Sequence, residues 1–162
     1  MNNLNTSDVA RQNILNNKYA LSILEQQLNP KALSFDGEIV FTKDMIASYF
    51  EVDTRTVERY ISDYRTELTR NGYRKLSGRD LIQFKNDNKD SFGTDINVGT
   101  KTTILSIFNF RAFLDIGMLL SDSDVAKELR NAILDIVIDV MNQRSGGKTK
   151  YINQRDSDFL IS

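Results

Sequence analysis

The sequence predicts an α+β fold that is mostly α, with a helix-turn-helix core, a small β-hairpin and a possible wing, followed by a C-terminal helical pair. Three observations support this prediction. Helical hydrophobic periodicity runs through much of the 162-residue chain. An Asp-Gly pair separates two short alternating segments. Residues 42–62 have the spacing of two helices that cross at a tight turn.

The expected organisation is a small domain with flanking segments. Its regions are an N-terminal helix that could dimerise (residues 1–31), a helix-turn-helix region (32–85), a flexible loop (86–101), a strand-helix-helix region packing on the same core (102–147), and a linker or the start of a missing C-terminal domain (148–162). The length fits one ordinary domain or two very small ones.

The N-terminal region is interpreted as one continuous helix over residues 6–28. Within it, small or apolar residues and one asparagine recur at alternating spacings of four and three: Ala10, Ile14, Asn17, Leu21, Leu24 and Leu28. That spacing is typical of a short coiled coil, in which a single buried Asn fixes register and oligomer state. Two interpretations stay open, namely packing on the helix's own domain and self-association into a homodimer.

The second region begins with strand signals and continues into helices. Asp36-Gly37 is a favoured two-residue hairpin turn between alternating apolar residues. Helical periodicity follows from Thr42 to about Arg70, where Asn71-Gly72 supplies a left-handed stop. We expect a short strand at 73–76 and a short helix at 79–85.

Residues 42–62 match a helix-turn-helix in detail. Thr42 is suited to cap the first helix, and Asp53 or Thr54 the second. Ala47 is the small residue required where the two helices cross. The turn carries Glu51 where glycine is usual, which costs roughly 1 kcal/mol because the backbone enters the left-handed region there.

Charge distribution suggests what this motif binds. The chain has a net charge of −1, yet residues 54–79 hold seven Lys or Arg against three Asp or Glu. An arginine on a recognition helix at 54–62 grips guanine or a phosphate, and threonines near the helix start suit phosphates. The residues expected to contact DNA are Thr54, Arg55, Thr56, Glu58, Arg59, Ser62, Arg65, Arg74 and Lys75. The alternative is a helical hairpin with the same core in a protein-binding domain.

The C-terminal half begins with a segment of little periodicity. Residues 86–101 are rich in Asn, Asp and Gly, and indicate a loop or an extended wing. A strand is expected at 102–108, followed by a helix that Asn109 caps and that runs to Leu120. The Ser-Asp-Ser-Asp run at 121–124 then starts the longest helix of this half.

Composition argues against catalysis. The chain contains no histidine and no cysteine, which removes the usual imidazole and thiolate groups of triads and zinc sites. No glycine-rich phosphate loop is present either. We therefore expect no enzyme, no cofactor and no metal site. The sequence contains neither a signal peptide nor a membrane-spanning run, so a cytoplasmic location is expected.

Two stretches resemble known families. VDTRTVERYI followed by ELTRNGYRKLSG resembles the N-terminal DNA-binding region of RhuM-type virulence-associated and phage-antirepressor-like proteins. FNFRAFLDIGMLLSDSDVAKELRNAILDIV resembles the C-terminal part of Bro-N-type antirepressor domains. The resemblance implies a bacterial, prophage or mobile-element protein whose DNA-binding part is joined to a variable C-terminal domain.

Carried over residue by residue, the resemblance implies DNA contacts at Arg55 and Arg59. It also implies that three basic residues shape the second half: Arg111, Lys127 and Arg130. The alternative for those three is solvation at the surface or ion pairs with neighbouring acids: Asp115, Asp124 and Glu128.

Together these inferences predict a DNA-binding module of a transcriptional regulator or antirepressor, a homodimer that binds double-stranded DNA. Two other classes stay open. One is a protein-interaction module that sequesters a repressor without touching DNA. The other is the targeting domain of a larger toxin or nuclease, with a protein partner or active site in a C-terminal domain.

Overall fold

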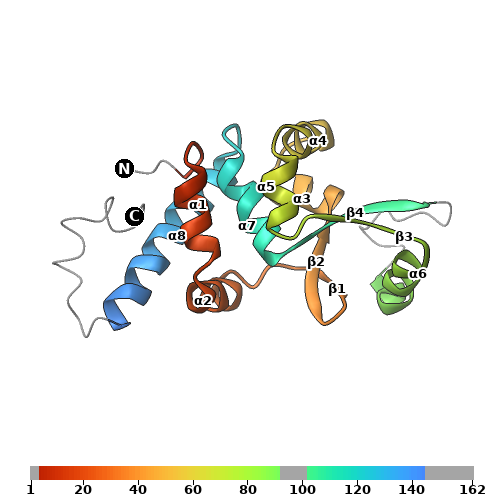
Figure 1. Ribbon diagram of the computed structural model, residues 1–162, viewed down its shortest axis with the longest axis horizontal. Helices are drawn as coiled ribbons and strands as arrows, with labels where there is room; N and C mark the ends of the chain where they lie inside the picture. The colour runs from red at the N-terminus through yellow and green to blue at the C-terminus, as the bar shows by residue number, and fades with distance from the viewer. Residues whose placement is uncertain (1–3, 92–101, 145–162) are drawn as a thin grey trace. The chain divides into compact units, whose positions relative to one another are not determined.

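The computed structural model describes residues 4–91 and 102–144 (Figure 1). Its fold is α+β and mostly α, which confirms the predicted fold class. The chain divides into two compact units, one formed by residues 1–30 with 117–162 and the other by residues 31–116. The expected 102–147 region is therefore split between the two units, with the division inside helix α7 (Phe110–Leu119). The predicted linker at 148–162 lies outside the described residues.

A β-hairpin opens the 31–116 unit, as predicted. It consists of β1 (Leu33–Phe35) and β2 (Glu38–Thr42). The two residues between them have positive φ angles, 54° at Asp36 and 79° at Gly37. A turn of this kind matches the right-handed twist of the flanking strands, and Asp-Gly adopts it at low cost.

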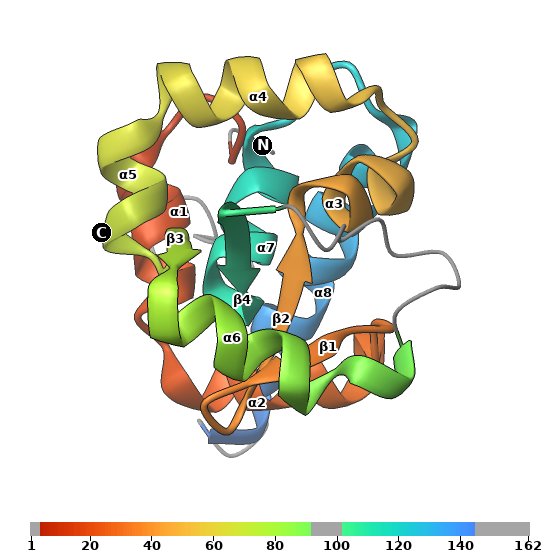
Figure 2. The same ribbon diagram turned by 90° about the vertical axis from the view of Figure 1, so that its right-hand side faces the viewer.

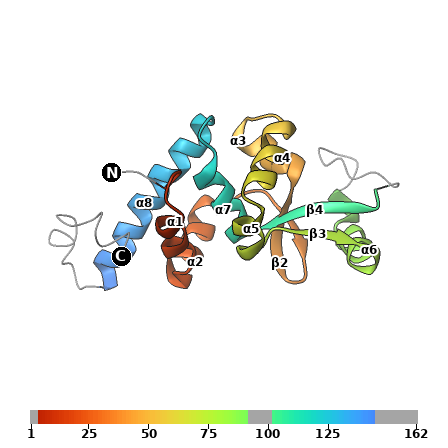
Figure 3. The ribbon, with the colours of Figure 1, turned by 45° about the horizontal axis from the view of Figure 1, so that its top comes forward.

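The hairpin extends into a four-stranded antiparallel sheet of order β1-β2-β4-β3, of which Figure 3 labels β2, β4 and β3. The added strands are β3 (Arg74–Ser77) and β4 (Ile104–Asn109), close to the predicted positions. Although β3 precedes β4 in sequence, β4 occupies the place between β2 and β3 because it pairs with both.

The two faces of this sheet have different cores. One face, which we call the α6 face, carries Leu33, Phe35, Val40, Leu76 and Ile107, and it packs on Leu81 and Phe84 of helix α6 (Gly78–Asp87). The other, which we call the aromatic face, carries Phe41 and Phe108, with Tyr73 just before β3, and it packs on aromatic residues of the helices that follow β2 and β4: Tyr49, Phe50, Phe110 and Phe113. At its centre the Phe113 ring stacks on Phe41 with centroids 4.5 Å apart. The strict alternation of strand side chains produces this separation.

Helix α6 is longer than the predicted helix at 79–85, and it takes in the first residues of the loop expected at 86–101. Residues 86 and 87 belong to α6, and Lys89–Ser91 form a short 3-10 helix. Asn88, between them, accepts a hydrogen bond from Ser34 N–H (2.9 Å) and donates one to Ser34 O (2.7 Å). Its amide thus pairs with β1 as a neighbouring strand would. The rest of the expected wing, residues 92–101, lies outside the described residues.

Helices α3 (Lys43–Phe50), α4 (Thr54–Asp63) and α5 (Arg65–Arg70) follow β2. Figure 2 shows α4 at the upper end of this unit, α5 bending down from it, and β3 and α6 below. The predicted stop after α5 is confirmed at Gly72, whose φ is 114°.

Asn71 and Tyr73, on either side of Gly72, form hydrogen bonds with α7 and with β4. Asn71 is buried, donates to Asp115 Oδ2 (3.0 Å) and accepts from Arg111 Nη2 (2.9 Å). The Tyr73 hydroxyl lies 2.9 Å from Ser106 Oγ. These bonds connect the end of α5 to α7 and to the sheet.

The other unit contains α1 (Asp8–Leu15), α2 (Lys18–Leu28) and α8 (Asp124–Arg144). The prediction of one continuous helix over 6–28 is wrong, because the chain breaks at Asn16–Asn17. Asn17 is the N-cap of α2, and its Oδ1 accepts from Ala20 N–H at 3.0 Å. A side chain occupied in capping is not the buried Asn of a coiled-coil seam, so the hypothesis of a continuous seam fails.

Within this unit α2 packs against both α1 and α8. Ser123 Oγ accepts from Ala126 N–H at 3.0 Å, which confirms that the 121–124 run starts the long helix. In residues 4–91 and 102–144, no helix combines the length and apolarity needed to cross a bilayer.

Candidate nucleic-acid interface

The two helices α3 and α4 are joined by a turn of three residues, 51–53. Thr42 caps α3, since its Oγ1 accepts from Met45 N–H at 3.1 Å. Glu51 ends α3 in the left-handed region with a φ of 56°, as the motif requires. Val52 N–H then donates to Ala47 O at 3.0 Å, which closes the helix end in the Schellman pattern. The predicted turn geometry is confirmed.

Asp53 caps the start of α4. Its Oδ1 accepts from Thr56 N–H at 2.8 Å and from the Thr56 hydroxyl at 3.0 Å. These two hydrogen bonds, with smaller contributions from the Arg55 and Arg59 charges, hold the pKa of the Asp53 carboxyl below its usual value. Asp53, rather than Thr54, is therefore the cap. Thr56, which was predicted to contact DNA, uses both its N–H and its hydroxyl to bond Asp53.

One side of α4 is buried and fixes how the helix lies. Val57, Tyr60 and Ile61 point into the core, and α4 packs on α3. Ala47 is only 5% exposed, as the small residue at a helix crossing should be. These contacts leave the opposite side of α4 facing solvent.

The opposite side of α4 carries an exposed row that we call the α4 stripe: Arg55, Glu58, Arg59 and Ser62. These residues share one helix face because they are three, four and seven positions apart. Two contacts connect the start of α4 to the start of α3. Glu58 Oε2 lies 2.7 Å from Lys43 Nζ, and the Thr54 hydroxyl donates to Asp44 at 3.5 Å.

Aromatic side chains flank the α4 stripe toward its C-terminal end. The Arg59 guanidinium lies 5.3 Å from the centre of the Tyr60 ring. The Tyr60 ring in turn stacks on Tyr64, at a centroid distance of 5.9 Å. A cation over an aromatic face is attracted to the ring quadrupole, so Arg59 is held near the surface of α4.

Sequence reasoning named the α4 residues but missed Lys43 and Tyr64. Tyr64 lies where α4 bends into α5, and helical periodicity alone does not mark a bend between two helices. The only sign of Lys43 in the sequence is its position as the first residue after the predicted cap Thr42, which does not indicate a binding role. Its partner Glu58 lies fifteen residues away, so no local spacing rule connects them.

The remaining predicted contacts lie outside α4. Arg65 is exposed at the start of α5, next to the bend. Arg74 lies on the α6 face opposite Ile107, 3.3 Å from Asp80 and with its guanidinium 5.3 Å from the Phe35 ring centre. Lys75, one residue later, is exposed on the other face of β3. Arg74 and Lys75 therefore lie on opposite faces of the sheet and do not form one surface with each other.

The charges of α4 itself are balanced. The helix carries two basic residues, Arg55 and Arg59, and two acidic ones, Glu58 and Asp63. The surplus of basic residues that the sequence places between 54 and 79 is distributed over α5, β3 and α6 instead. The net charge of α4 is therefore zero, and its affinity for an anion depends on the positions of its two arginines.

The three basic residues singled out in the second half have different surroundings. Arg111 donates to buried Asn71, as described above. Arg130 is itself buried and donates to Leu120 O at 2.7 Å, with longer bonds to the carbonyls of residues 117 and 118. Its charge lies at the carbonyl end of α7, where a cation is favoured. Lys127 is exposed. Arg111 and Arg130 thus make hydrogen bonds within the fold, whereas the alternative of solvation at the surface fits Lys127.

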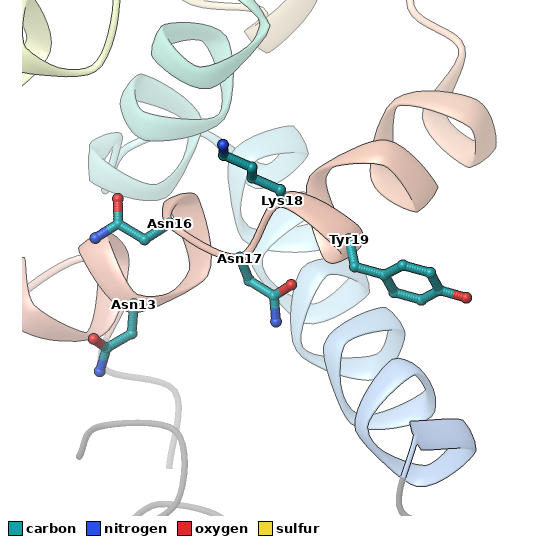
Figure 4. Close-up of a pocket in the computed structure, with 5 residues that line it drawn as sticks. All are labelled: Asn13, Asn16, Asn17, Lys18 and Tyr19. Atoms are coloured by element: carbon teal, nitrogen blue, oxygen red, sulfur yellow. The ribbon is translucent and has the colours of Figure 1, made fainter.

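A shallow depression lies on the other unit, between α1 and α2 (Figure 4). It is lined by Asn13, Asn16, Asn17, Lys18 and Tyr19. Figure 4 shows these side chains directed away from one another, so they do not converge on a common point. A ligand site requires converging polar groups in a concave pocket. The stripe on α4 is therefore the better candidate for a functional surface.

No protein-family model, curated protein or solved structure matches this chain.

Proposed function

We propose that this chain is a double-stranded DNA-binding module that inserts α4 into the major groove. The α4 stripe is the part that would face the bases. In this arrangement Arg55 and Arg59 bind guanine edges or phosphates, and Ser62 and Thr54 lie nearer the backbone. The cellular setting that we infer is a cytoplasmic regulator or antirepressor of bacterial or prophage origin.

One observation carries the proposal. Two capped helices, a left-handed Glu51 and a buried Ala47 at the crossing hold α4 against the core by one side only. The opposite side then projects a polar row from the start of the helix. A helix-turn-helix protein reads base edges with the first residues of its second helix, which is where Arg55, Glu58 and Arg59 lie.

A titration of duplex DNA tests this proposal. Fluorescence anisotropy with a random-sequence duplex at about 50 mM salt should detect binding by the wild type. Arg55→Ala/Arg59→Ala should weaken the affinity on the order of 100-fold. The slope of log affinity against log salt should fall by about one for each phosphate contact removed. Absence of binding by the wild type at low salt would contradict the proposal.

A second candidate function is a protein-interaction module. The balanced charges of α4 favour it, because a helix face with no net charge, with Ser62 on it and Tyr64 exposed beside it, also suits a protein partner. Under this alternative the Arg55→Ala/Arg59→Ala variant binds the protein partner more weakly than the wild type does. Neither the wild type nor the variant then binds duplex DNA. The same titration therefore separates the two functions.

The homodimer predicted from the sequence loses its coiled-coil basis, since the helix breaks at Asn16–Asn17. Dimeric binding to two half-sites stays a prediction. Sedimentation of the protein alone and on a duplex would test it, with two copies per duplex as the expected result.

A further inference from the structure

We propose that Glu58 is a base-reading residue that accepts a hydrogen bond from the N4 amine of a cytosine, and that Lys43 positions it for this contact. The inference rests on the proposed DNA-binding function and deepens it. It names the base that one side chain of the α4 stripe selects.

The position of Glu58 within the stripe is the first support. It lies one turn after Arg55 and directly before Arg59, so it shares the face that would meet the bases. Its side chain is 53% exposed, which leaves it accessible to a partner. A carboxylate is acceptor-only, and the major-groove group that it fits is the cytosine N4 amine.

The ion pair with Lys43 is the second support. A lone carboxylate facing DNA would be repelled by the phosphates. The Lys43 ammonium, 2.7 Å from Glu58 Oε2, offsets that charge and fixes the carboxylate at the start of α3. Within residues 4–91 and 102–144, Glu58 Oε1 makes no hydrogen bond, so one oxygen stays available for a base.

The arginines on either side of Glu58, Arg55 and Arg59, extend the base preference to the whole stripe. Arginine pairs best with guanine, and glutamate with cytosine, so the three charged residues of the stripe all favour G·C pairs. We therefore expect the preferred DNA to be rich in G·C at the positions facing α4. Glu58 specifies at least one of those positions, by placing cytosine on the contacted strand.

Selection from a duplex library with a randomised central segment tests the inference. The wild type should enrich cytosine at one position by about tenfold over other bases. Glu58→Gln should shift the enrichment at that position to adenine, because a glutamine amide pairs with adenine N6 and N7. Lys43→Met should reduce enrichment at the same position. Glu25→Gln on α2 removes the same charge from an exposed site of the other unit and should leave the selected sequences unchanged.

The outcomes are distinguishable. If the wild type selects a sequence and Glu58→Gln selects the same one, the inference is overturned while DNA binding stands. If Glu58→Gln binds all sequences more tightly without changing the preference, Glu58 acts only by repulsion, and the inference is again overturned. If the wild type binds no duplex, the proposed function fails and the inference with it. Thermal melting of each variant confirms that the proteins compared are folded.

Discussion

Helices α4 and α6 belong to the same unit and are similar in length, burial and charge. Each has ten residues, each buries one apolar side, and each carries two basic and two acidic residues that cancel. Net charge therefore gives no reason to assign DNA binding to one and not the other. Any difference in function must come from how the two helices are held.

The contacts of the two helices differ in kind. Asp53 caps α4 through its side chain, whereas Ser77 before α6 makes no such bond. The charges of α4 meet the first turn of another helix, through Lys43 and Glu58. A charge of α6 instead pairs with the sheet, through Asp80 and Arg74. Helix α4 therefore differs from α6 by its place in a helix-turn-helix, whereas α6 packs on and pairs with the sheet.

The largest expected effect is on stability, from Phe84→Ala in α6. The Phe84 ring is fully buried and lies edge-on to Phe35, with centroids 6.3 Å apart. Its loss should lower the free energy of unfolding by about 3–5 kcal/mol, measured by denaturant titration. Ile82→Ala on the same helix is the control, and it should change stability little because Ile82 is 61% exposed. Under conditions where Phe84→Ala stays folded, its DNA affinity should match the wild type, and a loss there would assign α6 a binding role.

The next effect concerns affinity and compares matched pairs of basic residues. Arg55→Ala/Arg59→Ala removes two positive charges from α4, and Arg79→Ala/Lys85→Ala removes two from α6. The α4 pair should cost on the order of 100-fold in duplex affinity, and the α6 pair about twofold, because only distant charge is lost. Equal losses in anisotropy titrations would mean that binding depends on net charge alone.

A smaller effect is expected at the turn, from Glu51→Gly. Glu51 has a φ of 56°, a conformation that glycine adopts without the Cβ penalty. The variant should be more stable by roughly 0.5–1 kcal/mol in chemical denaturation, with the same DNA affinity. A destabilised variant would show that the Glu51 side chain makes a contribution that outweighs the backbone strain.

The smallest effect is a pH dependence that Asp53 introduces and Ser77 does not. Because the pKa of Asp53 is held below its usual value of 3.8, its ionised form stabilises the fold fully above that pH. This contribution is lost as pH falls through the lowered pKa, when the carboxyl protonates. Melting temperatures from neutral to acid pH should therefore converge for wild type and Asp53→Asn, which cannot titrate. Ser77→Ala should follow the wild type throughout, and parallel curves for Asp53→Asn would contradict the assignment.

Local features of this fold were predictable from the sequence. The Asp36-Gly37 turn and the caps at Thr42 and Asn109 each depend on a side chain and a backbone group within three residues. The helix-turn-helix followed for the same reason, since Ala47 and Glu51 lie within one turn of each other.

Features that depend on distant partners, or on a choice between two local roles, were not predictable. Asn17 suits both a polar position in a coiled coil and a helix cap, and spacing alone could not decide between them. The Asn88 amide pairs with Ser34, fifty-four residues away, so residues 86–91 form the end of α6 and a 3-10 helix where a loop was expected. In the candidate site, the arginines on α4 were foreseen, but the dispersal of Arg74 to the α6 face depends on the sheet register.

The most direct test of DNA binding through α4 is to map the contact surface on an isotope-labelled protein. Backbone amide resonances recorded by NMR during titration with the selected duplex would compare α4 with α6 in a single experiment. We predict shifts concentrated at 54–62 and at Lys43, with α6 residues 78–87 unchanged. Shifts confined to α6, with α4 unaffected, would contradict the assignment of α4 as the DNA-binding helix.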